Sequence, residues 1–166
     1  MRRLDCRPLT AEAFAPFGQV IDTNGVVPEI INDGSTRRHS DLASLDLRRP
    51  DRDPVMSIYV ASARTFPLRI AKLERHQQAS QVFVPLGMHR FVVVVAPGGE
   101  APDWRNAAAF VTEPGQGVCL HRNCWHHGLI ALTDGDRFVV IEGGSYRGDT
   151  VEVAAAERID LWAPEQ

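Results

Sequence analysis

The chain has little of what marks a membrane protein or a nucleic-acid-binding protein. Its net charge is -3, and Lys72 is its single lysine beside 17 arginines. This charge gives no electrostatic preference for nucleic acid or for an anionic membrane surface. No apolar run approaches the ~18 residues that a membrane span requires, and the first residues lack the apolar core of a signal peptide. We therefore expect neither nucleic acid nor a membrane as a partner.

Cysteine is also scarce. Cys6, Cys119 and Cys124 cannot all pair within the chain, so the sequence predicts reduced thiols and a cytoplasmic protein. Cys119 and Cys124 lie on either side of His121, but a structural zinc site needs further Cys or His at ligand spacing. We interpret these two cysteines as core residues.

The pattern of apolar residues and turn residues predicts an all-β protein. The length of 166 residues and the hydrophobic content of 44% suit one domain, residues 1–166. Thr10 as N-cap and Glu12 in the first turn predict a short helix over residues 11–17. Turn residues separate the short β-type runs that follow. The expected strands are residues 19–22, 29–32, 54–61, 68–76, 81–85, 91–96, 107–112, 117–121, 127–132 and 138–142. Short strands without intervening helices favour an antiparallel sandwich or barrel.

Alternation along the expected strands places several polar side chains on one face. Side chains of a strand point to opposite faces in turn, so Glu74 and His76 share a face that Arg75 does not. Gln81 begins the next strand, after a short polar connection. His126 and His127 are adjacent, so only one of them can point inward. If the sheet closes, Glu74, His76 and Gln81 project into its interior.

The spacing of these residues resembles the two-part metal site of cupin barrels. Such barrels carry His-x-His-x4-Glu on one hairpin and a lone His on a later strand. Glu74, His76 and Gln81 match the first part position for position, and His126 stands eleven residues after Gly115, where the later His belongs. The resemblance predicts a cupin-type double-stranded β-helix, or jelly-roll barrel, with a short N-terminal helix.

A metal ion and a metal-free site both fit these four residues. Glu74, His76, Gln81 and His126 would favour a borderline divalent ion, with nickel first and manganese, iron or zinc as the other candidates. The same side chains could instead transfer protons without metal, with Glu74, His76 and His126 as the catalytic groups. The residue types leave this choice open.

Gln81 and three further residues are candidates for substrate binding. Arg38 could clamp a carboxylate through two parallel hydrogen bonds, with Asn32 beside it, or it could be a solvated loop residue. His121 ends an expected strand, where it could act as an acid or base at the mouth of the site or cap the turn. Trp125 is expected to pack in the core.

Longer strings of residues resemble the ureidoglycolate lyase family, formerly called ureidoglycolate hydrolase. The resemblance rests on Ile31-Asn32-Asp-Gly34, on Leu73-Glu-Arg-His76 and on His121-Arg-Asn123-Cys-Trp-His-His127. It implies a cupin fold, a homodimer and a carbon–nitrogen lyase of allantoin breakdown in purine catabolism. Its members split ureidoglycolate into glyoxylate and urea, some with a divalent metal such as nickel.

Two other classes of function remain open at this level. One is a cupin enzyme of different chemistry, although an Fe(II) oxygenase normally uses a more nitrogen-rich ligand set than Glu74 and Gln81 provide. The other is a non-catalytic barrel that binds a small ligand, since fold alone does not fix function.

Overall fold

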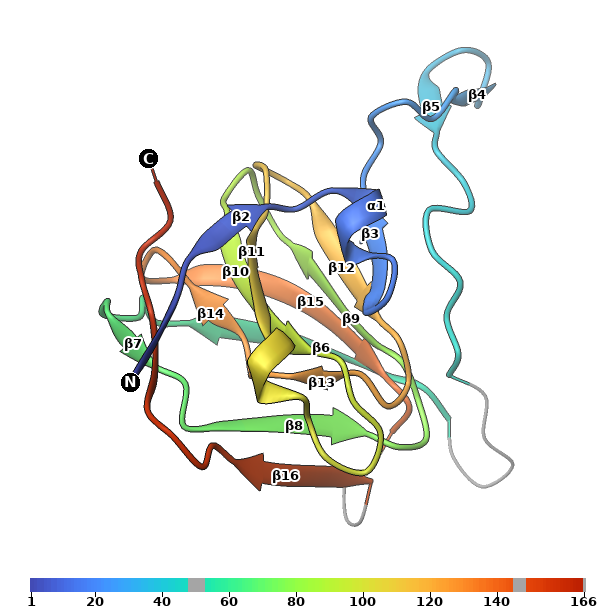
Figure 1. Cartoon of the computed structure of the whole chain (residues 1–166). Helices are drawn as coiled ribbons and strands as arrows, with labels where there is room; N and C mark the ends of the chain where they lie inside the picture. Colours follow the sequence, from blue (N-terminus) through green and yellow to red (C-terminus); the bar gives the residue numbers. More distant parts are fainter. Residues whose placement is uncertain (48–52, 145–148, 166) are drawn as a thin grey trace.

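The computed structural model describes residues 1–47, 53–144 and 149–165 (Figure 1). Its helical segments are α1 (Ala11–Phe14) and η1 (Trp104–Asn106). In chain order, its strands are β1 (Arg2–Leu4), β2 (Cys6–Pro8), β3 (Gly18–Ile21), β4 (Glu29–Ile31), β5 (Thr36–Arg38), β6 (Val55–Ala61), β7 (Leu68–Arg69), β8 (Lys72–His76), β9 (Gln81–Pro85), β10 (Phe91–Ala96), β11 (Ala108–Val111), β12 (Gly117–Leu120), β13 (Trp125–His126), β14 (Ile130–Ala131), β15 (Asp136–Glu142), β16 (Thr150–Ala154) and β17 (Ile159–Leu161). The all-β prediction is confirmed.

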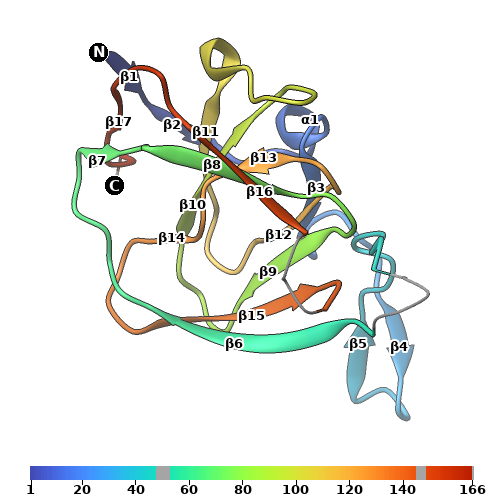
Figure 2. The same ribbon diagram turned by 90° about the horizontal axis from the view of Figure 1, so that it is seen from below.

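Two larger sheets face each other (Figures 1 and 2). One has seven strands in the order β16-β8-β13-β10-β11-β2, with β14 also paired to β10. The other has five strands in the order β3-β12-β9-β15-β6. A smaller sheet, β1-β17-β7, covers the outer face of the seven-stranded sheet and contributes Leu4 and Leu161 to the core there.

Strand β10 separates two hydrophobic cores. All six of its residues are buried, because both faces of the strand are covered. Phe91, Val93 and Val95 point into the core between the two larger sheets, together with Phe138. The alternate residues point into the outer core, which also contains Trp125. The predicted packing role of Trp125 is confirmed.

The strand pairing departs from a closed barrel. Within the described residues, β6 and β16 are the last strands of their sheets and are not paired with each other. The cupin barrel expected from the site spacing therefore stays a prediction. The pairing is also not wholly antiparallel, since β1 runs parallel to β17 and β2 runs parallel to β11.

Helix α1 begins where the sequence predicts and ends earlier. The hydroxyl of Thr10 accepts a hydrogen bond from the Ala13 amide at 3.2 Å, which caps the first turn. The predicted helix extended to residue 17, but it ends at Phe14. Pro16 has no amide hydrogen to continue the ladder, and the chain turns there into β3.

Strands β4 and β5 form an arm that stands away from the two sheets in Figure 1. We define the arm as residues 23–43. Its base is held by two hydrogen bonds, from Gln116 to Asp22 at 2.8 Å and from the Ser44 amide to Gln19 at 2.8 Å. Its tip is a tight turn in which Asn32 and Asp33 both have positive φ, a conformation that Asn and Asp tolerate better than most residues.

The described residues contain no helix that is both long enough and apolar enough to cross a bilayer.

Candidate metal centre

Strand β8 presents three polar side chains to the space between the two sheets. Lys72, Glu74 and His76 alternate with Leu73, which lies in the outer core, and Arg75, which stacks on Trp125. The predicted separation of Glu74 and His76 from Arg75 is therefore confirmed. Arg75 is itself buried, on the face of β8 that points away from the cluster.

Neighbouring strands bring two further residues to the same face. His126 of β13 pairs with Glu74, and Thr150 of β16 pairs with His76. Nε2 of His126 lies 3.6 Å from Oε1 of Glu74, and the His76 and His126 rings are 5.3 Å apart. One ligand atom from each of Glu74, His76 and His126 lies within 4.8 Å of the others, close enough for the three to share a metal ion.

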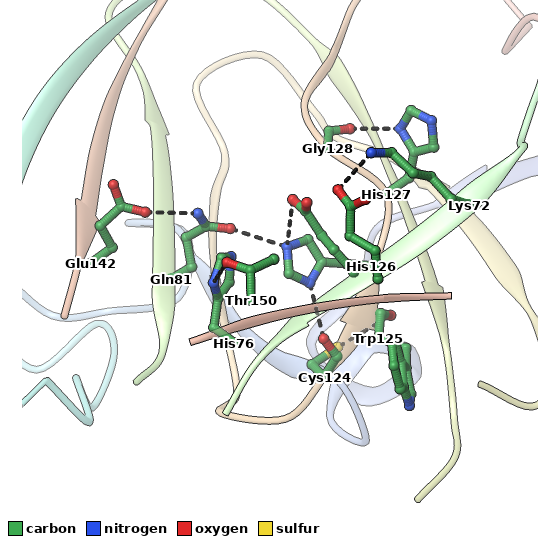
Figure 3. A network of polar contacts seen from close by, with 12 residues as sticks. Lys72, His76, Gln81, Cys124, Trp125, His126, His127, Gly128, Glu142 and Thr150 are labelled. Atoms are coloured by element: carbon green, nitrogen blue, oxygen red, sulfur yellow. Dashed lines mark hydrogen bonds and ion pairs between the residues drawn. The ribbon is translucent and has the colours of Figure 1, made fainter. Parts of the chain in front are cut away.

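Gln81 reaches this group from the opposite sheet (Figure 3). It is directly opposite Glu142 in the β9–β15 ladder, and its amide nitrogen donates a hydrogen bond to Oε2 of Glu142 at 2.9 Å. This bond fixes the direction of the amide, because a carboxylate accepts hydrogen bonds and the NH₂ group donates them. The amide oxygen of Gln81 is consequently turned toward Nε2 of His126, at 3.1 Å.

The hydrogen-bond partner of Nδ1 determines which ring nitrogen of His126 carries the hydrogen. Nδ1 lies 2.9 Å from the carbonyl oxygen of Cys124, which can only accept, so Nδ1 carries the hydrogen. In the neutral ring Nε2 then offers a lone pair, and it faces the oxygens of Gln81 and Glu74. Three electron-rich atoms converge on one point, an arrangement that requires a cation or an added proton between them.

Burial opposes the added proton on His126. The ring is 1% exposed, and burial, reinforced by the nearby His76 and His127, lowers the pKa of His126 to about 3. Burial is also the main cause that raises the pKa of Glu74, and the Glu152 carboxylate adds to it. A donor set of two imidazoles, a carboxylate and an amide oxygen suits a borderline divalent ion. The residues therefore fit a metal centre.

A small cavity opens beside Glu74 and His126. Its volume is about 150 Å³, and it is also lined by Lys72, His127 and Gly128. The Lys72 ammonium is bound by Glu152 at 2.5 Å. The Thr150 hydroxyl lies 3.3 Å from Nδ1 of His76 (Figure 3).

The structure does not bring all predicted site residues together within one chain. Asn32 and Arg38 lie on the arm, where the Asn32 amide bonds to Thr36 at 3.2 Å and Arg38 forms an ion pair with Glu29. His121 is exposed after β12 and lines hollows beside α1. The predicted substrate contacts of these three residues stay predictions.

Sequence reasoning missed three residues of the cluster. Alternation from Phe138 through Val140 would have placed Glu142 on the inner face, and alternation from Glu74 would have placed Lys72 there. Thr150 escaped because β16 itself was not predicted. Cys119 and Cys124 are buried free thiols, which confirms their interpretation as core residues.

The fold and the cluster define an all-β protein with a buried histidine–carboxylate centre of the kind that holds a divalent metal. The family model described as ureidoglycolate lyase matches residues 1–161, and the chain belongs to this family. A protein of Pseudomonas savastanoi pv. phaseolicola named ureidoglycolate lyase is 46% identical over 142 residues, covering 86% of this chain and 84% of its own. One of Azotobacter vinelandii with the same name is 46% identical over 142 residues, covering 86% of both chains.

Proposed function

We propose that this protein is a ureidoglycolate lyase, which cleaves ureidoglycolate into glyoxylate and urea in allantoin breakdown. The observation that carries the proposal is the convergence of the Glu74, Gln81 and His126 acceptor atoms beside a small cavity. Membership of the ureidoglycolate lyase family, with relatives at 46% identity, supplies the substrate class.

The reaction moves one proton within the substrate. Ureidoglycolate carries a hydroxyl, a carboxylate and a ureido nitrogen on one carbon. As the C–N bond breaks, the hydroxyl oxygen loses its proton and forms the aldehyde of glyoxylate, while the departing nitrogen gains a proton and becomes urea. A single side chain at the reacting carbon can carry out both transfers if its pKa lies near the working pH.

Glu74 is the residue suited to carry that proton. Its carboxyl group lines the cavity, and burial raises its pKa toward neutrality. Oε1 is directed toward His126, which leaves the second oxygen to accept the hydroxyl proton and return it to the urea nitrogen. His76 and His126 orient the reacting groups, and the Cys124 carbonyl and Thr150 in turn hold these two rings.

Glu74, His76, Gln81 and His126 would hold a divalent ion, with nickel as our first candidate and manganese, iron or zinc as the others. Bound there, the ion would act as a Lewis acid that lowers the pKa of a substrate hydroxyl. Glu142 would act on the ion indirectly, because its carboxylate fixes the orientation of the Gln81 amide.

Four broader parts of the proposal are less specific to the site. We propose one domain over residues 1–166 and a cupin-type arrangement, since both larger sheets contribute to one inner core. Free Cys6, Cys119 and Cys124 support a reducing cytoplasmic location. The fourth part is that two copies of the chain form a homodimer.

The test is product release from ureidoglycolate by the purified protein. Urea, glyoxylate and ammonia are assayed together, before and after chelator treatment and again after nickel or manganese is restored. Equal urea and glyoxylate without ammonia, lost with chelator and regained with metal, is the expected result. Activity that survives proven metal removal would replace the metal-dependent form with the metal-free one. Ammonia in place of urea, or no product, would reject the lyase assignment.

A further inference from the structure

The small cavity beside the candidate metal centre is lined mainly by groups that accept hydrogen bonds. Glu74 and His126 line it, and the Glu74 oxygens and Nε2 of His126 carry lone pairs. His127 adds a third acceptor. Its Nδ1 lies 2.9 Å from the Gly128 carbonyl and donates there, so Nε2 of the neutral ring keeps a lone pair. Lys72 is the exception in this lining, because an ammonium group only donates.

Lys72 reaches the cavity from the same face of β8 as Glu74. The two residues alternate with Leu73, which lies in the outer core, so their Cα atoms are separated by about 7 Å along the strand. The flexible four-carbon stem of lysine can span such a distance. The Lys72 side chain therefore lies at the edge of the cavity that it shares with His126 and His127 (Figure 3).

The ion pair between Lys72 and Glu152 leaves donors of the ammonium group unused. Nζ donates to Oε1 of Glu152 at 2.5 Å, the one hydrogen bond it makes among the described residues. An ammonium group has three N–H bonds, so two remain for a ligand. The side chains are 55% and 48% exposed, so the pair lies at the surface, where a ligand can enter. Ion pairs exposed to this degree hold their partners weakly, and Lys72 can turn toward a bound anion.

The proposed substrate requires such a donor. The ureido nitrogens and the hydroxyl group of ureidoglycolate donate hydrogen bonds, so they suit the lone pairs of the cavity. Its carboxylate only accepts, and the same lone pairs repel it. Among the described residues that line the cavity, Lys72 is the one lysine or arginine, and hence the side chain that attracts a carboxylate. A carboxylate bound there brings the hydroxyl group of the adjoining carbon toward Glu74.

We propose that Lys72 binds the carboxylate of the substrate through the N–H donors that Glu152 does not use. The ammonium group thereby selects anionic over neutral substrates and turns the substrate hydroxyl toward Glu74. The identity of the substrate rests on the proposed function, whereas the binding of a small carboxylate in the cavity does not.

Two unreactive fragments of the substrate test this proposal without turnover. Glycolate and glycolamide share the α-hydroxyl group, but one carries a carboxylate and the other a neutral amide. Titration of the protein supplied with nickel gives the Kd of each. We expect Lys72→Gln to raise the glycolate Kd by about 10-fold and to leave the glycolamide Kd within about 2-fold. An unchanged glycolate Kd, an equal rise for both fragments, or a wild type that does not bind glycolate would overturn the proposal.

Arg64→Gln is the matched control for charge. Burial lowers the pKa of His127, and Arg64 and Lys72 add to this effect, so both cations lie near that ring. Arg64 lines a neighbouring groove with Tyr59 and Leu129, whereas Lys72 lines the cavity. We therefore expect wild-type glycolate affinity in Arg64→Gln. A loss as large as that of Lys72→Gln would assign the effect to the general field of the protein and reject the contact.

Glu152→Gln separates the ammonium group from its ion pair. If Lys72 merely stabilises the pairing of β8 with β16, the loss of either member should weaken glycolate binding equally. If the ammonium group itself binds the carboxylate, Glu152→Gln should keep or improve the glycolate affinity, because a competing carboxylate is removed. Equal losses in Lys72→Gln and Glu152→Gln would contradict the proposal.

Turnover distinguishes this inference from the proposed function. With ureidoglycolate, Lys72→Gln should lower kcat/KM by about 10-fold. Glycolate binding that depends on Lys72, in a protein without lyase activity, would reject the proposed function alone. Lyase activity together with a glycolate affinity that is indifferent to Lys72 would reject the inference alone.

Discussion

The amide oxygen of Gln81 and Nε2 of His126 lie 3.1 Å apart, and both are hydrogen-bond acceptors. Each residue directs its N–H toward another partner, Gln81 to Glu142 and His126 to the Cys124 carbonyl. Two facing acceptors repel each other unless something positive lies between or beside them. The residues behind the cluster therefore determine its preference for a cation.

Glu142 should control metal affinity without being a ligand. Glu142→Ala removes the acceptor that fixes the Gln81 amide, and we expect the nickel Kd to rise by about 10-fold to 100-fold. Glu142→Gln retains an oxygen that can accept the same bond and should stay within a few-fold of wild type. Calorimetric titration of the apo protein measures both. Glu113→Ala, an exposed change, is the control, and wild-type affinity in Glu142→Ala would contradict the role.

His76 and His126 should each be required for turnover but not for folding. His76→Ala and His126→Ala remove imidazoles from the centre, so we expect activity to fall below detection while circular dichroism shows the wild-type fold. Glu157→Ala, an exposed change between β16 and β17, should keep wild-type activity and is the control. Near-normal turnover in either of the first two variants would remove that residue from the site.

The stability of the metal-free protein should fall on acidification because of His126. Its pKa is about 3 in the folded protein and near 6.5 in an unfolded chain. The unfolded state therefore takes up a proton below pH 6.5 that the folded state rejects, and stability present above pH 6.5 is lost as the pH falls toward 3. Between pH 7 and pH 5 the loss is about 2 kcal/mol.

Urea unfolding at pH 5, 6 and 7 measures this loss, with His126→Asn as the comparison. Glu74 has a raised pKa and an effect of opposite sign, with stability lost as the pH rises above 4.5. Because Glu74 is present in both proteins, the difference between them reports His126. An equal pH dependence in the two would contradict the assignment.

Arg75 should stabilise the fold from the other face of β8. Its guanidinium lies 4.7 Å from the centre of the Trp125 ring and donates a hydrogen bond to the Gly99 carbonyl at 2.6 Å. We expect Arg75→Ala to lower the free energy of unfolding by about 2 kcal/mol, and Arg75→Lys by about half as much. Nickel affinity should change little. Arg69→Ala, on an exposed part of β7, provides the control in the same urea titration.

Alternation within strands predicted the centre of the site because the signal is local. Glu74 and His76 share a face, Gln81 begins the next strand, and β9 and β10 have the predicted bounds. One expected strand, residues 68–76, divides into β7 and β8. The strand expected over residues 127–132 shortens to β14, and β13 lies before its predicted start. Apolar residues continue through these breaks, so hydrophobicity alone does not show where a strand changes its partner.

The pairing and the position of the arm could not be predicted from the sequence. Residues 29–32 were expected to form a strand, but Thr36–Arg38 has no apolar alternation, and its pairing with β4 depends on the turn at Asn32 and Asp33. The position of Arg38 relative to Glu74 depends on the path of the whole arm, which no spacing rule encodes. The chemistry of Arg38 favoured a place beside Glu74, but the fold of a single chain holds the arm away from the two sheets.

Lys72 is the only side-chain amine of the chain, and it lines the cavity beside Glu74. Amine-directed chemistry therefore acts on a single side chain, at the entrance of the proposed site. Methylation with isotope-labelled formaldehyde would give one side-chain signal in a carbon NMR spectrum, beside that of the α-amine. The shift of this signal would report the arrival of a metal ion, of glyoxylate or of a neighbouring chain, in a protein whose sequence is unaltered.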